Sequence, residues 1–110
     1  IMYNEQILRR IVELMVEKGV SKYQLKEHAE ISSTIYQWKK NAARDKDRVP
    51  SLRTIEKICD YFDVSLSYFF AFTKEEQRSV NEREIADRLR LLSDEQVMLV
   101  KELLMQFKDK

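Results

Sequence analysis

The chain has 110 residues and a formal net charge of +1, with 44% hydrophobic and 35% charged residues. This length allows one domain with a core, and the composition is that of a soluble globular chain rather than a disordered one. One Gly and one Pro are too few for the turns that sheets require, so we predict an all-α protein. The single cysteine forms no internal disulfide and fits a cytoplasmic location, and with no bilayer-length apolar stretch and no visible signal peptide we expect no membrane contact.

The first two helices are predicted from capping residues and apolar spacing. Asn4 is the expected N-cap of a helix that ends at Gly19, the residue type that favours the left-handed position after a helix. Its apolar residues repeat at helical spacing: Ile7, Leu8, Ile11, Leu14 and Met15. Ser21 then caps a short helix over residues 22–29. Its expected inner face consists of Tyr23, Leu25 and Ala29.

A third helix is predicted after a tight turn. Ser32 or Ser33 serves as its N-cap, and the helix runs to about residue 41. Ile35 and Trp38 lie three residues apart and therefore on one face, where they anchor the helix to the core. Residues 42–49 form an exposed charged connection.

Two further helices complete the predicted core. Pro50 ends the connection, and Ser51 caps a fourth helix. Its buried stripe is expected to hold Leu52, Ile55, Ile58, Cys59 and Phe62. Ser65 opens a short fifth helix. Its apolar residues are expected to close the core: Leu66, Tyr68, Phe69 and Phe70.

Two C-terminal helices are predicted from capping-box spacing, Thr73 with Glu76 and Ser93 with Gln96. The first carries a sparse apolar stripe: Val80, Ile85, Leu89 and Leu92. The last helix carries a fuller one: Val97, Val100, Leu103, Leu104 and Phe107. We expect this fuller stripe to mediate oligomerisation; the alternative is that it folds back onto its own domain.

The positive charge is local. Residues 33–57 hold seven basic and three acidic residues, whereas residues 73–110 hold eight basic and nine acidic ones. A local basic stretch is expected where one face meets phosphate, although a solvated charged loop is the alternative. Two short helices joined by a tight turn, followed by basic residues, match the need to place one helix in the major groove of double-stranded DNA.

Three segments carry a family resemblance: KGVSKYQL at residues 18–25, ISSTIYQWKK at residues 31–40, and PSLRTIEKICDYFDVSLSYFF at residues 50–70. They resemble the phage-repressor/Cro (XRE) family of helix-turn-helix regulators over about residues 7–70. The resemblance implies a five-helix lambda-repressor-like domain, its third helix in the major groove, and a homodimer on a pseudo-palindromic operator. We therefore divide the chain into a DNA-binding domain at residues 1–72 and a helical, oligomerising extension at residues 73–110.

The DNA-contacting residues follow from this alignment. The expected base-reading residues are Ser32, Ser33, Tyr36 and Gln37. Among them Gln37 is the strongest candidate, because an amide bonds adenine N6 and N7 in a bidentate way. The expected phosphate contacts are Lys22, Thr34, Lys39, Lys40, Arg44 and Arg48.

The resulting interpretation is a DNA-binding transcriptional regulator, acting as a repressor. The alternative is an antitoxin or adaptor that works through protein contacts of its C-terminal helices. No enzymatic activity, cofactor or metal is expected, because no paired acid and base, phosphate loop or metal-ligand spacing occurs. Cys59 is interpreted as a core residue and His28 as a surface residue.

Overall fold

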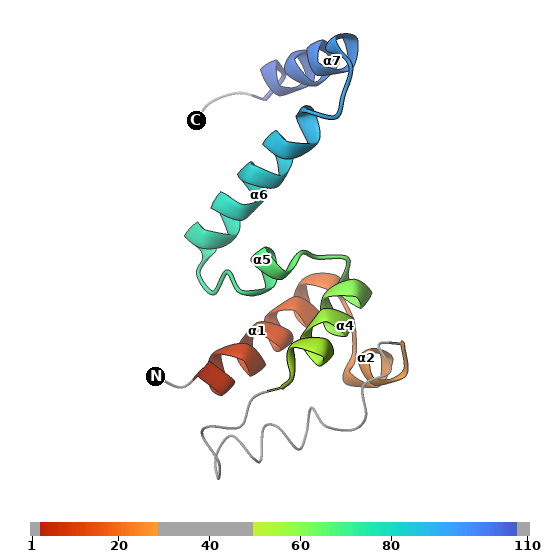
Figure 1. The fold of residues 1–110 in the computed structure, drawn as a ribbon, viewed down its shortest axis with the longest axis vertical. Coiled ribbons are helices and arrows are strands. Elements are labelled where there is room, and N and C mark those ends of the chain that lie inside the picture. Colours follow the sequence, from red (N-terminus) through yellow and green to blue (C-terminus); the bar gives the residue numbers. More distant parts are fainter. Residues whose placement is uncertain (1–2, 29–49, 108–110) are drawn as a thin grey trace.

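Every regular element in the described part of the chain is a helix (Figure 1). The computed structural model describes residues 3–28 and 50–107. In chain order and with the labels of Figure 1, its helices are α1 (Tyr3–Lys18), α2 (Lys22–His28), α4 (Leu52–Phe62), α5 (Leu66–Phe69), α6 (Lys74–Leu89) and α7 (Asp94–Met105). The predicted all-α class is confirmed. The helix expected over residues 33–41 lies outside the described residues.

The first helix ends as its sequence predicts. Gly19 has a φ of 65°, and its N–H donates to the carbonyl of Val16 at 3.2 Å. The N–H of Val20 donates to the carbonyl of Met15 at 2.8 Å. These two bonds satisfy carbonyls that the end of a helix leaves without intrahelical partners. The next helix follows at once, because Ser21 and Gln24 form a reciprocal capping pair.

The other predicted caps are confirmed by their hydrogen bonds. The side-chain oxygens of Ser51, Ser65, Thr73 and Ser93 each accept from the backbone N–H three residues later. α6 and α7 both have full capping boxes. The expected N-cap at Asn4 is wrong, because α1 already begins at Tyr3. A polar residue inside a first helical turn has the same sequence signature as a cap one residue before it.

One hydrophobic core joins α1, α2, α4 and α5. Among the described residues, its buried members are Ile7, Ile11, Leu14, Met15, Leu25, Ile55, Ile58, Cys59, Phe62 and Phe69. Tyr23 and Leu52 were expected in it but are 71% and 57% exposed. Tyr23 lies two residues from Leu25, and residues two apart do not share a helix face. Leu52 is the first residue of α4, and its side chain points largely to solvent.

Helix α5 contributes one fully buried side chain. Phe69 is buried, whereas Leu66 and Phe70 are exposed and Tyr68 is partly buried. The expectation that all four residues close the core is therefore wrong in part. In this single turn only Phe69 is fully buried, while Tyr68 packs against the edge of the core.

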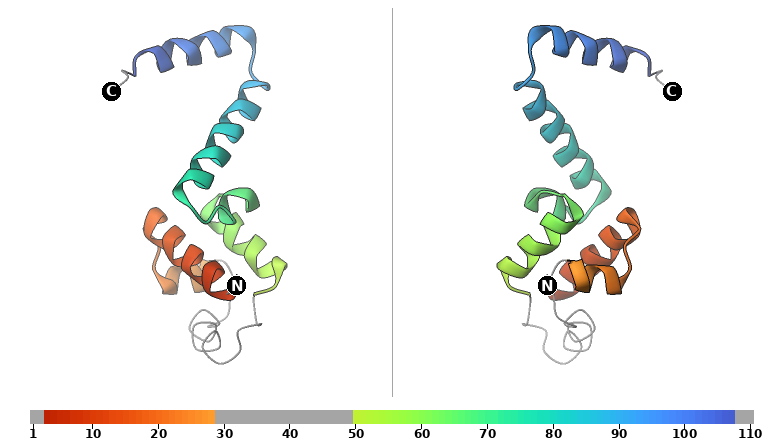
Figure 2. Two further views of the ribbon diagram at one scale, coloured as in Figure 1. Left: turned by 90° about the vertical axis from the view of Figure 1, so that its left-hand side faces the viewer. Right: turned by 90° about the vertical axis from the view of Figure 1, so that its right-hand side faces the viewer.

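The C-terminal arm, which we define as α6 and α7, leaves this core. α6 packs against α5, and α7 has no buried residue. Both side views show α7 apart from α1, α2 and α4 (Figure 2). Within the described ranges, no helix has the length and apolar character needed to cross a membrane.

Candidate nucleic-acid interface

Most of the expected DNA-contacting residues lie outside the described residues, and their roles stay predictions. They are Ser32, Ser33, Thr34, Tyr36, Gln37, Lys39, Lys40, Arg44 and Arg48. Lys22 is described: it is the first residue of α2, and it is exposed. The structure does fix the scaffold on either side of residues 29–49.

The two flanking helices are held in the same core. α2 and α4 pack against each other (Figure 1). Leu25 of α2 is fully buried, and Pro50, directly before the cap of α4, is buried too. The chain is therefore anchored in the core on both sides of residues 29–49, at Leu25 and at Pro50.

The starts of α2 and α4 are positively charged. Neither first turn carries an acidic residue, and the two turns hold Lys22 and Arg53, both exposed. In contrast, α6 and α7 begin with acidic residues: Glu75, Glu76, Asp94 and Glu95. Acidic side chains complement the partial positive charge of a helix N-terminus. Without them, the starts of α2 and α4 keep a positive potential that suits a phosphate backbone.

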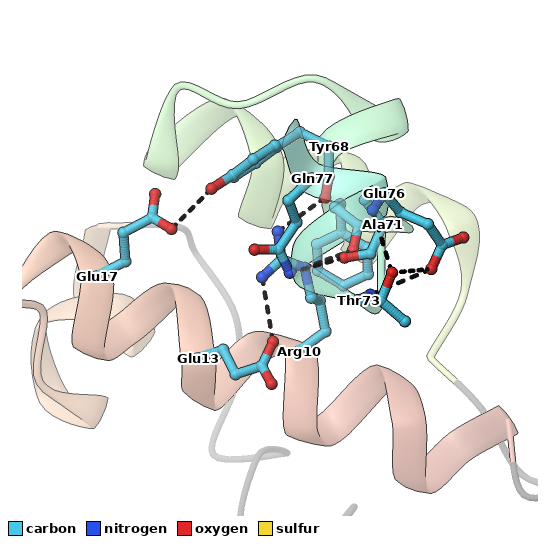
Figure 3. A network of polar contacts seen from close by, with 9 residues as sticks. Arg10, Glu13, Glu17, Tyr68, Ala71, Thr73, Glu76 and Gln77 are labelled. Atoms are coloured by element: carbon cyan, nitrogen blue, oxygen red, sulfur yellow. Dashed lines mark hydrogen bonds and ion pairs between the residues drawn. The ribbon is translucent and has the colours of Figure 1, made fainter. Parts of the chain in front are cut away.

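A buried arginine holds α5 against α1, which sequence reasoning missed (Figure 3). Arg10 is 2% exposed. Its Nε and Nη2 each donate a 2.8 Å hydrogen bond, to the carbonyl oxygens of Phe69 and Tyr68 respectively. Its Nη1 bonds Glu13 at 3.2 Å, and the guanidinium lies 4.8 Å from the centre of the Tyr68 ring.

The arginine satisfies carbonyls at the end of a very short helix, where a cation also complements the helix dipole. The sequence contains a signal for this: Arg10 lies three residues after Ile7 and four before Leu14, so it shares their buried face.

A second hydrogen bond joins α1 and α5. The Tyr68 hydroxyl donates to Glu17 at 2.8 Å, and burial together with this bond raises the pKa of Tyr68 above its ordinary value.

Cys59 is a core residue, as interpreted from the sequence. It is 3% exposed, and burial with the nearby Asp60 and Glu56 charges raises the pKa of its thiol from 9.0 to about 11. A thiol protonated at neutral pH is a poor nucleophile and a poor metal ligand. In the two described ranges, no group of three or more His, Cys, Asp or Glu side chains is placed to hold a metal ion.

The expected oligomerisation residues lie at the far end of the arm. Val97 and Val100 are partly buried, and Leu103 and Leu104 are exposed. Phe107 is also exposed but lies after the end of α7 at Met105, so its expected place within the helix is wrong. The physical reason is local: the chain turns at Gln106, whose N–H donates to Leu103 in a tight i→i+3 bond that ends the helix.

The four described helices around one core, with a basic segment between α2 and α4, fit the helix-turn-helix class of DNA-binding domain. A family model of the Cro/C1-type HTH DNA-binding domain matches residues 10–75, more than half of the chain. The chain belongs to this family, which confirms the resemblance seen in the sequence. Neither the curated proteins nor the solved structures gave a match. The protein is thus a DNA-binding regulator with a helix-turn-helix domain.

Proposed function

We propose that the protein is a sequence-specific transcriptional repressor that binds its operator as a homodimer. The observation that carries this proposal is the Cro/C1-type match over residues 10–75, which coincides with the core of α1, α2, α4 and α5. In the proposal, residues 1–72 bind DNA and residues 73–110 hold the two copies together. The regulator acts in the cytoplasm, beside the DNA that it binds.

Recognition of the operator is assigned to the segment between α2 and α4. The helix expected over residues 33–41 enters the major groove, and its base-reading residues are Ser32, Ser33, Tyr36 and Gln37. The phosphate contacts come from Lys22, Thr34, Lys39, Lys40, Arg44 and Arg48. The exposed Lys22 at the positive start of α2 supports a phosphate contact there.

The dimer is assigned to the C-terminal arm. α7 has 12 residues and no buried side chain. An isolated helix of roughly 12–15 residues is marginal in water, so α7 needs a partner surface for its stability. The exposed large apolar residues that could meet such a surface are Ile85, Leu91, Leu92, Met98, Leu99, Leu103, Leu104, Met105 and Phe107.

A second copy of the chain is the partner that fits best. A single helix-turn-helix unit reads few base pairs, and two units about 34 Å apart read successive turns of the same DNA face. Specific dimers bury about 800 Å² per partner, and the exposed apolar side chains of the arm are numerous enough to supply most of that area. A different protein on the same surface, as in an antitoxin or adaptor, is the outcome to be tested against.

The test combines selection of bound duplexes from a random DNA pool with light scattering on the free protein. We expect an enriched inverted repeat whose half-sites are centred about 10 base pairs apart, or a multiple of that spacing. We also expect a dimer in solution and lower reporter expression when the selected site overlaps a promoter. No enrichment over the starting pool would contradict the proposal. A monomer that binds one unrepeated site would contradict its dimeric part.

A further inference from the structure

The base of α6 is attached to the DNA-binding unit by a buried side chain. Gln77, in the first turns of α6, is 8% exposed. Its Nε2 donates a hydrogen bond of 3.0 Å to the carbonyl of Ala71, in the link that joins α5 to α6 (Figure 3). Ala71 is itself 3% exposed. A buried amide with its partner in place resists movement, because displacement would leave both groups unpaired.

A second attachment lies further along the same helix. The hydroxyl of Ser65, which caps α5, donates to Oε1 of Glu84 across 19 residues of sequence. Gln77 and Glu84 are seven residues apart, which is close to two helical turns and about 10.5 Å along the axis. They therefore share the face of α6 that meets α5. Two contacts separated along the helix oppose rotation about either one.

The element that receives these contacts is fixed in turn. Arg10 ties the carbonyls of Tyr68 and Phe69 to α1, and the side chain of Phe69 is fully buried in the core. Arg10 and the N–H of Ala71 both donate to the carbonyl of Tyr68, and Gln77 donates to the carbonyl of Ala71, so hydrogen bonds connect α1 to α6. Figure 3 shows Arg10 and Gln77 on either side of this connection. The direction in which α6 leaves the core is set by side chains and not by the linker backbone alone.

We propose that this two-point attachment makes α6 a rigid spacer, and that Gln77 and Glu84 thereby determine which spacing of operator half-sites the regulator accepts. The inference rests on the proposed function, in which the arm dimerises and two DNA-binding units read two half-sites. Neither residue contacts DNA in this arrangement. They are positioning residues, because they act through the direction of α6.

The dimensions of α6 show why its base matters. Its 16 residues span about 24 Å. A tilt of roughly 10° at the base of such a helix moves its far end by about 4 Å. Successive base pairs are about 3.4 Å apart along the duplex. If α6 were free to tilt by this amount, the accepted distance between half-sites would vary by about one base pair.

The turn between α6 and α7, residues 90–93, forms a short elbow that becomes covered in the dimer. The N–H groups of Leu91 and Leu92 donate to the carbonyls of Arg88 and Leu89, at 3.0 and 3.2 Å. Leu91 is 78% exposed, next to the apolar residues of α7. A second copy seated on α7 meets these side chains and immobilises the elbow. The base of α6 is then the joint on which the spacing depends.

The experiment uses the full chain and the duplex enriched from the random pool. Its half-site spacing is changed by one or two base pairs in either direction, and a further duplex keeps a single half-site. Affinities are compared for wild type, Gln77→Ala/Glu84→Ala and the control Glu82→Ala. Glu82 is exposed, carries the same charge as Glu84, and pairs with Arg78 of its own helix rather than with α5.

We expect wild type and the control to lose about tenfold in affinity on a one-base-pair change, and the double variant to lose less than about threefold. Affinity for the single half-site and the dimer dissociation constant should stay within about twofold of wild type. A dimeric double variant that keeps the wild-type spacing preference overturns the inference alone. A monomeric wild type overturns the proposed function and this inference together.

A second measurement does not depend on DNA. Spin labels at Val16→Cys in α1 and Ala86→Cys in α6, both exposed positions, report the distance between these helices. Cys59 is 3% exposed and stays unlabelled. With excess unlabelled protein, we expect a narrow distance distribution in wild type and a broader one after Glu84→Ala, which removes only an exposed contact. Equal widths in the two proteins overturn the inference.

Discussion

The guanidinium Nε of Arg10 lies 2.8 Å from the carbonyl oxygen of Phe69, a residue 59 positions later in the chain. This bond closes the end of α5 with a side chain from α1. Without it, the carbonyl of Phe69 and the Nε–H of Arg10 would both be buried without a hydrogen-bond partner. Such a contact is costly to break from either side, because each group depends on the other for its hydrogen bond.

We therefore expect Arg10→Met to lower the free energy of unfolding by about 3 kcal/mol, since it leaves the carbonyl of Phe69 without its donor and removes one of the two donors to the carbonyl of Tyr68. Methionine keeps most of the side-chain length and removes the charge and the donors. Urea unfolding followed by circular dichroism measures the change. The neighbouring Arg9→Met, at an exposed position, should stay within about 0.5 kcal/mol of wild type. Equal effects at both positions would show that the buried hydrogen bonds add nothing.

The ends of the helices could be predicted from the sequence because they depend on residues three or four positions apart. The caps at Ser21, Ser51, Ser65, Thr73 and Ser93 are all confirmed by hydrogen bonds. Such caps satisfy backbone groups locally, and the polar residue and its partner are visible in one short window. The family resemblance is confirmed by the match over residues 10–75, and the expected order of helices is observed within the described residues.

The contacts between distant elements could not be predicted in the same way. Arg10 and Gln77 are buried although their residue types are mostly exposed in proteins. Helical spacing places Arg10 on the buried face of α1, but no sequence pattern marks the backbone carbonyls that Arg10 and Gln77 bond. Leu52 shows the opposite error, since it fits the helical spacing of its stripe but has a largely exposed side chain. The base-reading residues stay predictions, because they lie outside the described residues.

The thiol of Cys59 predicts a loss of stability in alkaline solution. Its pKa is raised from 9.0 to about 11 in the folded chain. Between these values the folded state holds the proton more tightly than the unfolded state, so stability falls as the pH rises. The raised pKa of Tyr68 acts in the same direction above its ordinary value of 10.0. Guanidinium unfolding at about pH 8 and about pH 10.5 should show this decrease.

The variant Cys59→Ala should be less stable at neutral pH but show a smaller decrease on going to alkaline pH. Ile58→Val is the matched control, because it also removes buried volume and carries no titratable group. It should keep the wild-type pH dependence. The same pH dependence in all three proteins would mean that the ionisation of Cys59 is not coupled to folding.

Two truncations separate the contribution of α6 to the stability of the DNA-binding unit from its role in carrying the dimerising helix α7. A chain that ends at Leu89 keeps α6 and should fold as a monomer with weaker operator binding. A chain that ends at Phe72 also loses the bond from Gln77 to Ala71, and should be less stable than the longer truncation by about 1–2 kcal/mol. Thermal unfolding and light scattering measure both effects. Equal stability of the two truncations would show that α6 contributes nothing to the DNA-binding unit.

The apolar surface of α7 predicts that dimers dissociate when charge is placed on it. Leu103→Glu/Leu104→Glu changes two exposed residues, and burying each leucine is worth about 1.5–3 kcal/mol. The dimer dissociation constant should rise by about a hundredfold or more. Sedimentation at several concentrations measures it. The unfolding of the DNA-binding core should remain unchanged, because α7 has no buried residue.

The control for this surface is Gln106→Glu, which adds a negative charge just after α7 ends. It should leave the dissociation constant within about threefold of wild type. If the double leucine variant remains a dimer, the contact between copies lies elsewhere. If it remains folded but loses a different protein that co-purifies with wild type, the arm serves a protein partner instead.

Gln37→Ala tests the assignment of the base-reading segment. We expect affinity for the selected operator to fall by about 1–3 kcal/mol, because a bidentate amide contact to adenine is lost, while affinity for random duplex stays nearly unchanged.

Lys39→Ala provides the contrast, since a phosphate contact is the same in every sequence. It should weaken operator and random duplex alike and reduce the slope of log affinity against log salt by about 1. Titration of both duplexes at two salt concentrations gives, for each variant, the affinity for operator, the affinity for random duplex and the salt slope. Loss of equal size on operator and random DNA would remove Gln37 from base reading, and an unchanged salt slope would remove Lys39 from the phosphate contacts.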